Sequence, residues 1–404
     1  MITMIGQMTF EELAGQKLVW GMEGAQATPQ VVEFFKKTHA GGLVLFRRNI
    51  ESAGQLRELI SNLEADLGRR LLVMIDHEGG RVVHVGDGVT LFPDAGALGE
   101  SANLDWAKRQ GEIEGLELRR LGMDLNLAPV LDVLTNAWNP AIGDRSYGQD
   151  PEIVSRLGKA RIQGMQSQGL PACAKHYPGL GAAEFDPHQD LPIIRKNWKA
   201  MAECDLLPFV AAIKAGVEAI MSSHPVYPEL DERSGPATFS RKIIHDSLRG
   251  HLDFKGVVLT DDLKMGAVTK SVPLKEAAPL AVKAGHDLLL VCSDTRAQQA
   301  VFESLVWSYK KKELKTSELE ISVERIARLK EKNTGRFGEG KPAAQDEGPE
   351  LALEIARKGT RILKDGQGLI PLTASHLKSS TFVLFPDLSQ IAKFFFIETD
   401  SLNS

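Results

Sequence analysis

The sequence predicts an α/β protein whose main part is a (β/α)8 TIM barrel. Eight short apolar runs recur along the chain, and each is followed by a loop and then by a longer helical pattern. The runs are almost continuously apolar, as parallel strands are when helices cover the sheet. No Gly-x-Gly-x-x-Gly follows the first run, which disfavours the competing open, doubly wound sheet. The predicted strands are residues 17–24, 42–49, 71–78, 124–132, 172–177, 218–225, 257–262 and 287–294.

Local signals predict the remaining elements in chain order. Thr9 and Glu12 have capping-box spacing, which predicts a helix at the N-terminus. Residues 317–332 place apolar side chains, Ile321 among them, largely on one face and predict the helix that closes the barrel. Residues 335–350 are rich in Gly, Pro and charge, as linkers are. We therefore expect the catalytic barrel at 1–335 and a linker and interdomain segment at 336–372. Residues 373–404 resemble the truncated start of a second α/β domain, because one apolar strand cannot bury itself.

Composition and charge exclude several classes of protein. The 404 residues are 43% hydrophobic and 25% charged, which is typical of a soluble globular chain. A net charge of −5 gives no electrostatic case for binding nucleic acid. No run of 18 apolar residues predicts a membrane span, and the first residues lack the basic start of a signal peptide, so we expect a cytoplasmic protein. The three cysteines are odd in number and lack metal-ligand spacing, so we expect buried thiols, no metal and no cofactor.

Ionisable residues follow five of the predicted strands. Active sites of such barrels are assembled at the C-terminal ends of the strands, so these side chains should meet at one rim. A single residue such as His224 could have a structural role as readily as a functional one. The whole set together favours an active site at this rim of the barrel. The set comprises Asp76, Glu78, Asp132, Lys175, His176, His224, Asp261 and Asp262.

Two of these places indicate proton transfer and nucleophilic chemistry. After His176 the chain reaches no predicted helix until about Trp198, a connection far longer than usual in a compact domain. Within it, Pro187 favours an extended Asp186, whose carboxylate could orient the imidazole of His188. The alternative is a surface turn. Asp261, at the end of an apolar strand, is placed like a rigid nucleophile, with a helix N-cap as its alternative.

An ordered series of motifs resembles glycoside hydrolase family 3, in its β-N-acetylhexosaminidase (N-acetylglucosaminidase) branch. The resemblance covers about the first 335 residues, and the order of the segments makes it specific. The segments are GGLVLFRRNI, MIDHEGGRVVHV, NLAPVLDV, IGDRSYGQDP, AKHYPGLG, DPHQDLP, IMSSHPVYPELD, PATFS, FKGVVLTDDLKMGA and AGHDLLL.

The resemblance implies a role for each matching position. Asp261 would be the nucleophile that forms a covalent glycosyl-enzyme, and His188, oriented by Asp186, would be the acid/base. The terminal sugar would be held by Asp76, Arg145, Lys175 and His176, with Arg81 close by. The sequence departs from the family where a histidine and an Asp-Thr pair are usual and this chain has Leu180 and Ala182-Ala183.

These implications lead to one main hypothesis and three alternatives. The main one is an exo-acting, retaining β-N-acetylglucosaminidase that removes terminal N-acetylglucosamine from peptidoglycan- or chitin-derived fragments, with a small carbohydrate as its partner. A β-glucosidase or a glycoside phosphorylase could use the same barrel. A metal-dependent hydrolase is disfavoured because the first strand offers no His-x-His. A non-catalytic sugar-binding barrel is the last alternative.

Overall fold

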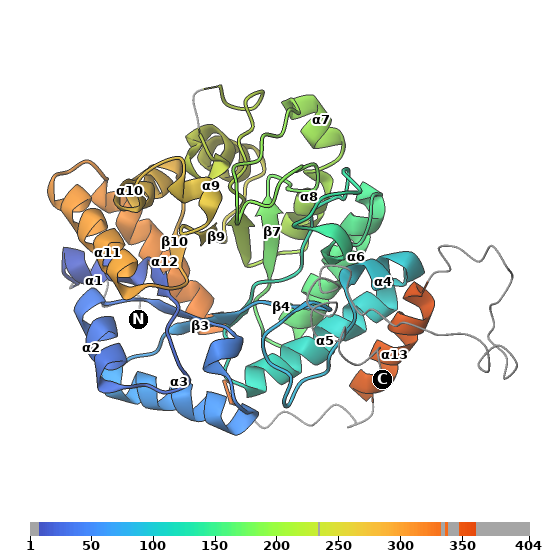
Figure 1. Ribbon diagram of the computed structural model, residues 1–404, viewed down its shortest axis with the longest axis horizontal. Coiled ribbons are helices and arrows are strands. Elements are labelled where there is room, and N and C mark those ends of the chain that lie inside the picture. Colours follow the sequence, from blue (N-terminus) through green and yellow to red (C-terminus); the bar gives the residue numbers. More distant parts are fainter. Residues whose placement is uncertain (1–7, 233–234, 333–335, 338–346, 361–404) are drawn as a thin grey trace, which may run out of the picture. The chain divides into compact units, whose positions relative to one another are not determined.

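The computed structural model describes residues 8–232, 235–332, 336–337 and 347–360, which belong to one compact unit, Met1–Thr360. Its centre is a sheet of eight parallel strands in the order β6-β3-β2-β1-β10-β9-β8-β7 (Figure 1). The eight predicted strands and the barrel class are confirmed. The strands are β1 (Leu18–Trp20), β2 (Gly42–Leu45), β3 (Leu72–Ile75), β6 (Leu125–Asn126), β7 (Cys173–Tyr177), β8 (Ala219–Ser222), β9 (Val257–Asp262) and β10 (Leu288–Val291).

Backbone hydrogen bonds close the sheet between β6 and β7. Asn126 pairs in parallel with Ala172, and the amide of Asn126 donates to the carbonyl of Pro171 at 3.1 Å. The amide of Cys173 donates to the carbonyl of Ala128 at 3.0 Å. Closure leaves no free edge between these strands, and it brings all eight strand ends to one rim.

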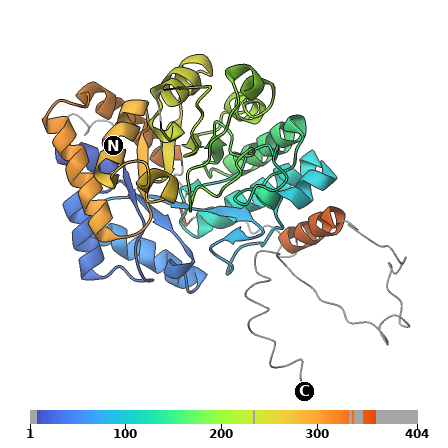
Figure 2. The ribbon, with the colours of Figure 1, turned by 45° about the horizontal axis from the view of Figure 1, so that its top comes forward.

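Helices surround the strands on the outside (Figures 1 and 2). A β-hairpin, β4 (His77–Gly79) with β5 (Val82–Val83), follows β3 directly at the rim. The helices are α1 (Phe10–Gln16), α2 (Pro29–Thr38), α3 (Ala53–Leu67), α4 (Ala95–Ser101), α5 (Leu104–Arg120), α6 (Pro151–Ser167), α7 (Trp198–Glu203), α8 (Leu207–Lys214), a π-helix (Lys242–His251), α9 (Gly266–Thr269), α10 (Leu274–Ala284), α11 (Thr295–Lys310), α12 (Thr316–Lys332) and α13 (Glu347–Gly359). Short 3-10 turns lie at Arg47–Asn49, Gly143–Arg145 and Ala237–Phe239.

The local helix signals are largely confirmed. Thr9 and Glu12 form the predicted capping box, with the Glu12 amide donating to Thr9 Oγ1 at 3.2 Å and the Thr9 amide donating to Glu12 Oε2 at 2.7 Å. Helix α12 occupies the predicted residues, but Ile321 is exposed, so its assignment to the buried face was wrong. None of the described helices combines the length and the apolar character needed to cross a membrane.

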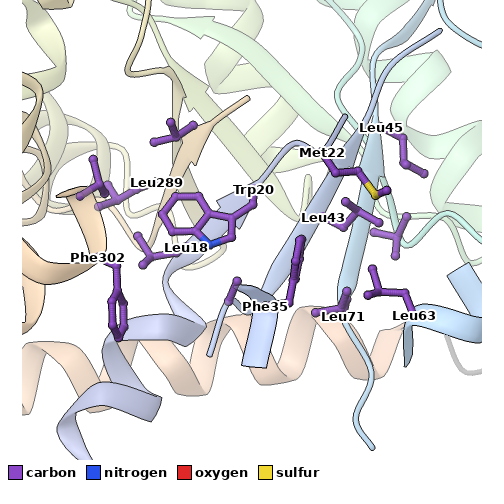
Figure 3. Close-up of a cluster of buried hydrophobic side chains, with 14 of the residues drawn as sticks. Leu18, Trp20, Met22, Phe35, Leu43, Leu45, Leu63, Leu71, Leu289 and Phe302 are labelled. Atoms are coloured by element: carbon purple, nitrogen blue, oxygen red, sulfur yellow. The ribbon is translucent and has the colours of Figure 1, made fainter. Parts of the chain in front are cut away.

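Alternate strand residues build two cores. Val19 on β1 belongs to the core inside the barrel, whereas Leu18 and Trp20 belong to the layer between the strands and the helices. Figure 3 shows that outer layer, where Trp20 of β1 and Phe35 of α2 belong to the same buried cluster. Because successive side chains of a strand point to opposite faces, strands buried on both faces must be apolar throughout. This explains the continuous apolar runs in the sequence.

Part of the segment expected to be a linker is packed on the barrel unit through Arg336 and helix α13. Arg336 forms ion pairs with Glu64, at 2.7 Å, and with Asp124. Helix α13 buries Leu351 and Ile355 in the cluster that also holds residues of α4, α5 and α6. The boundary at residue 335 stays a prediction, and the proposed C-terminal fragment, 373–404, lies outside the described residues.

Candidate active site

A network of buried ionic groups lies at the C-terminal end of the barrel. Lys175, on β7, is almost fully buried, and its Nζ lies 2.5 Å from Asp76 Oδ1 and 2.5 Å from Glu78 Oε1. Arg145 donates two hydrogen bonds to the carboxylate of Glu78, from Nε at 2.7 Å and from Nη2 at 2.8 Å. The structure therefore brings together three of the predicted sugar-binding residues, Asp76, Arg145 and Lys175. Glu78 connects them.

Mutual attraction keeps this network charged. Burial raises the pKa of Glu78, but the charges of Arg145 and Lys175 outweigh burial and hold the pKa of this carboxyl well below its usual range. Burial lowers the pKa of Lys175, and the carboxylates of Asp76 and Glu78 more than reverse this effect. The result is a set of fixed hydrogen-bond donors and acceptors of the kind that bind sugar hydroxyls.

Asp132 fixes the orientation of His176. Its Oδ2 lies 2.7 Å from His176 Nδ1, and its Oδ1 accepts the backbone amide of Leu180 at 2.6 Å. His176 Nε2 is then directed towards Arg145, whose Nη2 lies 3.5 Å away. One buried carboxylate thus positions both a ring at the rim and the start of the loop that follows β7.

Asp261 is the last residue but one of β9, and three histidines lie close enough to act on its charge. Its Oδ1 accepts the amide of Asp262 at 2.8 Å. Burial raises the pKa of Asp261, but the charges of His224, His176 and His188 outweigh burial and lower it below its ordinary value. A carboxylate kept ionised is in the form that acts as a nucleophile.

The N-cap alternative for Asp261 is wrong. Helix α9 begins at Gly266, and its N-cap is Met265. The turn before it is shaped by the other member of the pair, since Asp262 Oδ1 accepts the amides of Lys264, at 3.0 Å, and of Cys292, at 3.2 Å. Asp262 has the structural role and leaves Asp261 for the rim.

His224, which follows β8, supports this end of the barrel. Its Nδ1 lies 2.6 Å from Thr238 Oγ1, and its Nε2 lies 3.2 Å from the carbonyl oxygen of Asp262. Burial lowers the pKa of His224. Both ring nitrogens have partners within the protein. These contacts fit the structural role that the sequence left open for His224.

The predicted contact between Asp186 and His188 is present, but the backbone forms the turn considered as the alternative, since the amide of Gln189 donates to the carbonyl of Asp186 at 2.9 Å. Asp186 Oδ1 lies 2.7 Å from His188 Nδ1 and accepts the backbone amide of His188 at 2.9 Å. The hydrogen bond to Asp186 raises the pKa of His188; partial burial opposes the rise, and the charge of Asp261 adds to it. The His188 side chain is 64% exposed, so its ring faces open space where a leaving group could be protonated.

Of the unusual residues of the loop, Leu180 and Ala183 are buried and Ala182 is partly buried. Leu180 and Ala183 belong to an apolar cluster that also contains Ile142. The backbone is held by side-chain amides instead, with Asn139 Nδ2 donating to the carbonyl of Leu180 at 2.8 Å and Asn136 Nδ2 donating to that of Ala183 at 2.9 Å. Apolar packing and these two amides order the start of the loop in this chain.

Arg81 supports the site from outside. Its Nη2 donates to the carbonyl of Ile142 at 2.9 Å, close to the turn that carries Arg145. The Arg81 side chain thus stabilises the backbone of the segment that carries Arg145, a predicted sugar-binding residue. The expected proximity of Arg81 to the site agrees with this geometry.

Three site residues were not assigned a role from the sequence: Glu78, Asp132 and His84. The first two had a signal, since each follows a strand. His84 lies after the β4–β5 hairpin, with its ring edge-on to Phe46 at 5.2 Å between centroids. Burial lowers the pKa of His84, and the nearby charge of Asp76 opposes that effect. Within the described part of the chain, no group of three or more His, Cys, Asp or Glu side chains is arranged to hold a metal ion.

Comparisons with known proteins identify the family of this chain. Residues 5–329 match the glycosyl hydrolase family 3 N terminal domain. A protein named beta-hexosaminidase from Hydrogenovibrio crunogenus is 35% identical over 308 residues, 74% of this chain and 85% of that protein. A family 3 beta-N-acetylglucosaminidase from Paenibacillus superposes with a TM-score of 0.83 at 34% identity, over 87% of this chain and 69% of that chain. NagZ from Neisseria gonorrhoeae, solved with N-trifluoroacetyl-D-glucosamine, gives 0.68 at 28% identity, over 85% and 98%. The chain belongs to glycoside hydrolase family 3 and is a glycoside hydrolase.

Proposed function

We propose that this protein is an exo-acting, retaining β-N-acetylglucosaminidase. The observation that carries the proposal is the Asp186–His188 pair, with 2.7 Å between Oδ1 and Nδ1, on a loop whose imidazole interacts electrostatically with Asp261. The named activities of the relatives, beta-hexosaminidase and beta-N-acetylglucosaminidase, support the choice of sugar. Peptidoglycan- or chitin-derived fragments are the substrates that we propose.

The reaction would run in two steps. In the first, the Asp261 carboxylate attacks the anomeric carbon, the bond to the leaving oxygen breaks, and protonated His188 gives its proton to that oxygen. In the second, neutral His188 takes a proton from water, the water oxygen attacks the anomeric carbon, and Asp261 is released. Asp186 would keep the proton of Nδ1 in place, so that Nε2 exchanges protons in both steps.

The buried ionic network would hold the terminal sugar. Asp76 and Lys175 present a carboxylate and an ammonium group whose positions are fixed by the 2.5 Å contact between them. Arg145 and His176 approach from the neighbouring side, with 3.5 Å between their nitrogens. Preorganised groups of this kind can bind several hydroxyls of one ring without losing side-chain entropy at the moment of binding.

Two aryl glycosides test the choice of sugar. The purified protein should release nitrophenol from an aryl N-acetyl-β-glucosaminide much faster than from the corresponding β-glucoside. A folded protein that acts on the glucoside alone would contradict the proposal. Rapid NMR of the reaction should show the β-anomer of N-acetylglucosamine first, as retention requires.

A second experiment tests the nucleophile. A slow, fluorinated N-acetylglucosamine-type donor should leave a covalent adduct on the peptide that carries Asp261, and an adduct elsewhere would refute the assignment. Asp261→Asn should lower kcat by at least about 10³-fold, whereas Asp262→Asn, at the structural neighbour, is the matched control for a change in the turn.

A glycoside phosphorylase is the alternative that one observation favours. An imidazole as acid/base carries no negative charge in its neutral form and so does not repel an incoming phosphate as a carboxylate would. Phosphate-dependent formation of a sugar 1-phosphate, measured beside hydrolysis in phosphate-free buffer, distinguishes the two activities.

A further inference from the structure

The loop that carries His188 is anchored to the segment that follows Asp261. The amide of Gly266 donates to the carbonyl of His188 at 3.2 Å, and the amide of Ala267 donates to that of Pro187 at 3.1 Å. An exposed ion pair, Lys270 to Asp190 at 3.3 Å, connects the loop to the residue that follows α9. The acid/base loop therefore rests on α9, four residues long, whose first amides are satisfied by that loop.

The support for the loop is fixed relative to Asp261. The amide of Leu263 donates to the carbonyl of Leu290 on β10 at 3.0 Å, and the Leu263 side chain is fully buried. The amide of Met265 donates to the carbonyl of Asp262 at 3.0 Å. Because these bonds tie the turn to two barrel strands, the start of α9 cannot move without disturbing β9.

Gly266 leaves no space between α9 and the loop. A Cβ built at this position would lie 2.8 Å from the carbonyl oxygen of Gln189 and 2.9 Å from that of His188. Both are backbone atoms, so the contact cannot be relieved by turning a side chain. The φ of Gly266 is not in the left-handed region, so alanine fits the helix itself and has the higher helix propensity. The need for glycine at 266 thus comes from the loop alone.

We propose that Gly266 is a positioning residue: its lack of a side chain lets the loop rest directly on α9 and so sets the distance between His188 and Asp261. This inference depends on the proposed role of His188 as acid/base. Gly266→Ala should push the loop outward by displacing the His188 carbonyl, while the nucleophile stays on its strand. The proton donor is then misplaced and the attacking carboxylate is not.

The leaving group separates these two effects. An aryl N-acetyl-β-glucosaminide with a 2,4-dinitrophenyl group leaves without help from an acid, whereas the phenyl compound requires a proton. For Gly266→Ala we expect kcat/KM on the phenyl compound to fall by about 10- to 100-fold, as displacements near 1 Å do, and to change by less than about threefold on the dinitrophenyl compound. Equal losses on both substrates, or no loss on either, would overturn the inference.

Two controls accompany this experiment. Gly54→Ala, in the first turn of α3, adds a Cβ whose nearest neighbour is Ser52 Oγ at 3.9 Å, and it should change neither rate. His188→Ala should show the same leaving-group dependence more strongly than Gly266→Ala. If His188→Ala lacks that dependence, the proposed function fails; if it has the dependence and Gly266→Ala does not, only the role of Gly266 fails. Chymotryptic cleavage at the exposed Phe185 should also accelerate in Gly266→Ala, and unchanged cleavage would count against loop displacement.

Discussion

Glu78 pairs with both cations of the binding network, Lys175 and Arg145. Its side chain is 5% exposed and has two cationic partners, Lys175 at 2.5 Å and Arg145 at 2.7 Å. Glu78→Gln keeps the shape and removes the charge. Among the described residues, Asp76 is then the carboxylate that remains within reach of Lys175, and Arg145 keeps the carbonyl of Ala141 at 2.8 Å.

The expected loss follows from the burial of these charges. Leaving a buried ion without its partner costs about 3–5 kcal/mol, far more than the loss of an exposed pair. An unfolding entropy of about 2.1 cal/mol/K per residue, taken over the unit Met1–Thr360, amounts to about 0.75 kcal/mol/K, so Tm should fall by about 4–7 °C. Urea unfolding at 25 °C gives the free energy, and circular dichroism gives Tm.

Two further variants make the result interpretable. Glu324→Gln breaks an exposed pair with Arg328 at 3.4 Å and should cost less than about 0.5 kcal/mol. Lys175→Met removes one of the two cations that pair with Glu78, so in the double variant with Glu78→Gln that lost contact is counted once, and the double variant should lose less stability than the two single losses together. A loss below about 1 kcal/mol for Glu78→Gln, or simple additivity in the double variant, would refute the reasoning.

Three other predictions follow from the described contacts. Asp186→Asn removes the hydrogen-bonded charge that raises the pKa of His188, so the basic limb of kcat/KM against pH should move to lower pH; an unmoved limb would contradict the pairing. Burial lowers the pKa of Lys330 to about 7, below its value in the unfolded chain, so the unfolded chain binds more protons above pH 7. Lys330→Met should therefore raise the free energy of unfolding near pH 6, with a gain that shrinks towards pH 9 in urea unfolding. Leu180→His should cost about 1–3 kcal/mol because it buries an imidazole in an apolar cluster, whereas Leu91→His, at an exposed leucine, should cost little in the same assay.

The sequence by itself determined the barrel and the local chemistry. Strands buried on both faces must be apolar throughout, so each strand was visible as a short run, and the polar residue after each run had to lie at the rim. The Asp186–His188 contact is local, because the two residues are only two positions apart, but the sequence left it open against a surface turn, and the backbone there is a turn rather than the extended segment expected before Pro187. The position of Asp261 at the end of an apolar strand followed from the apolar run.

Only the tertiary structure decided which rim residues pair. Glu78 and Arg145 are 67 positions apart, and Asp132 and His176 are 44 apart, so no local pattern relates them. Their distances are set by closure of the sheet and by the loops that cross its end, which depend on packing summed over the whole unit. The same holds for the contact of the His188 loop with Gly266, where two remote segments meet at a spacing that a single methyl group would change. Periodicity and capping act within a few residues, whereas the geometry of the site results from contacts between distant ones.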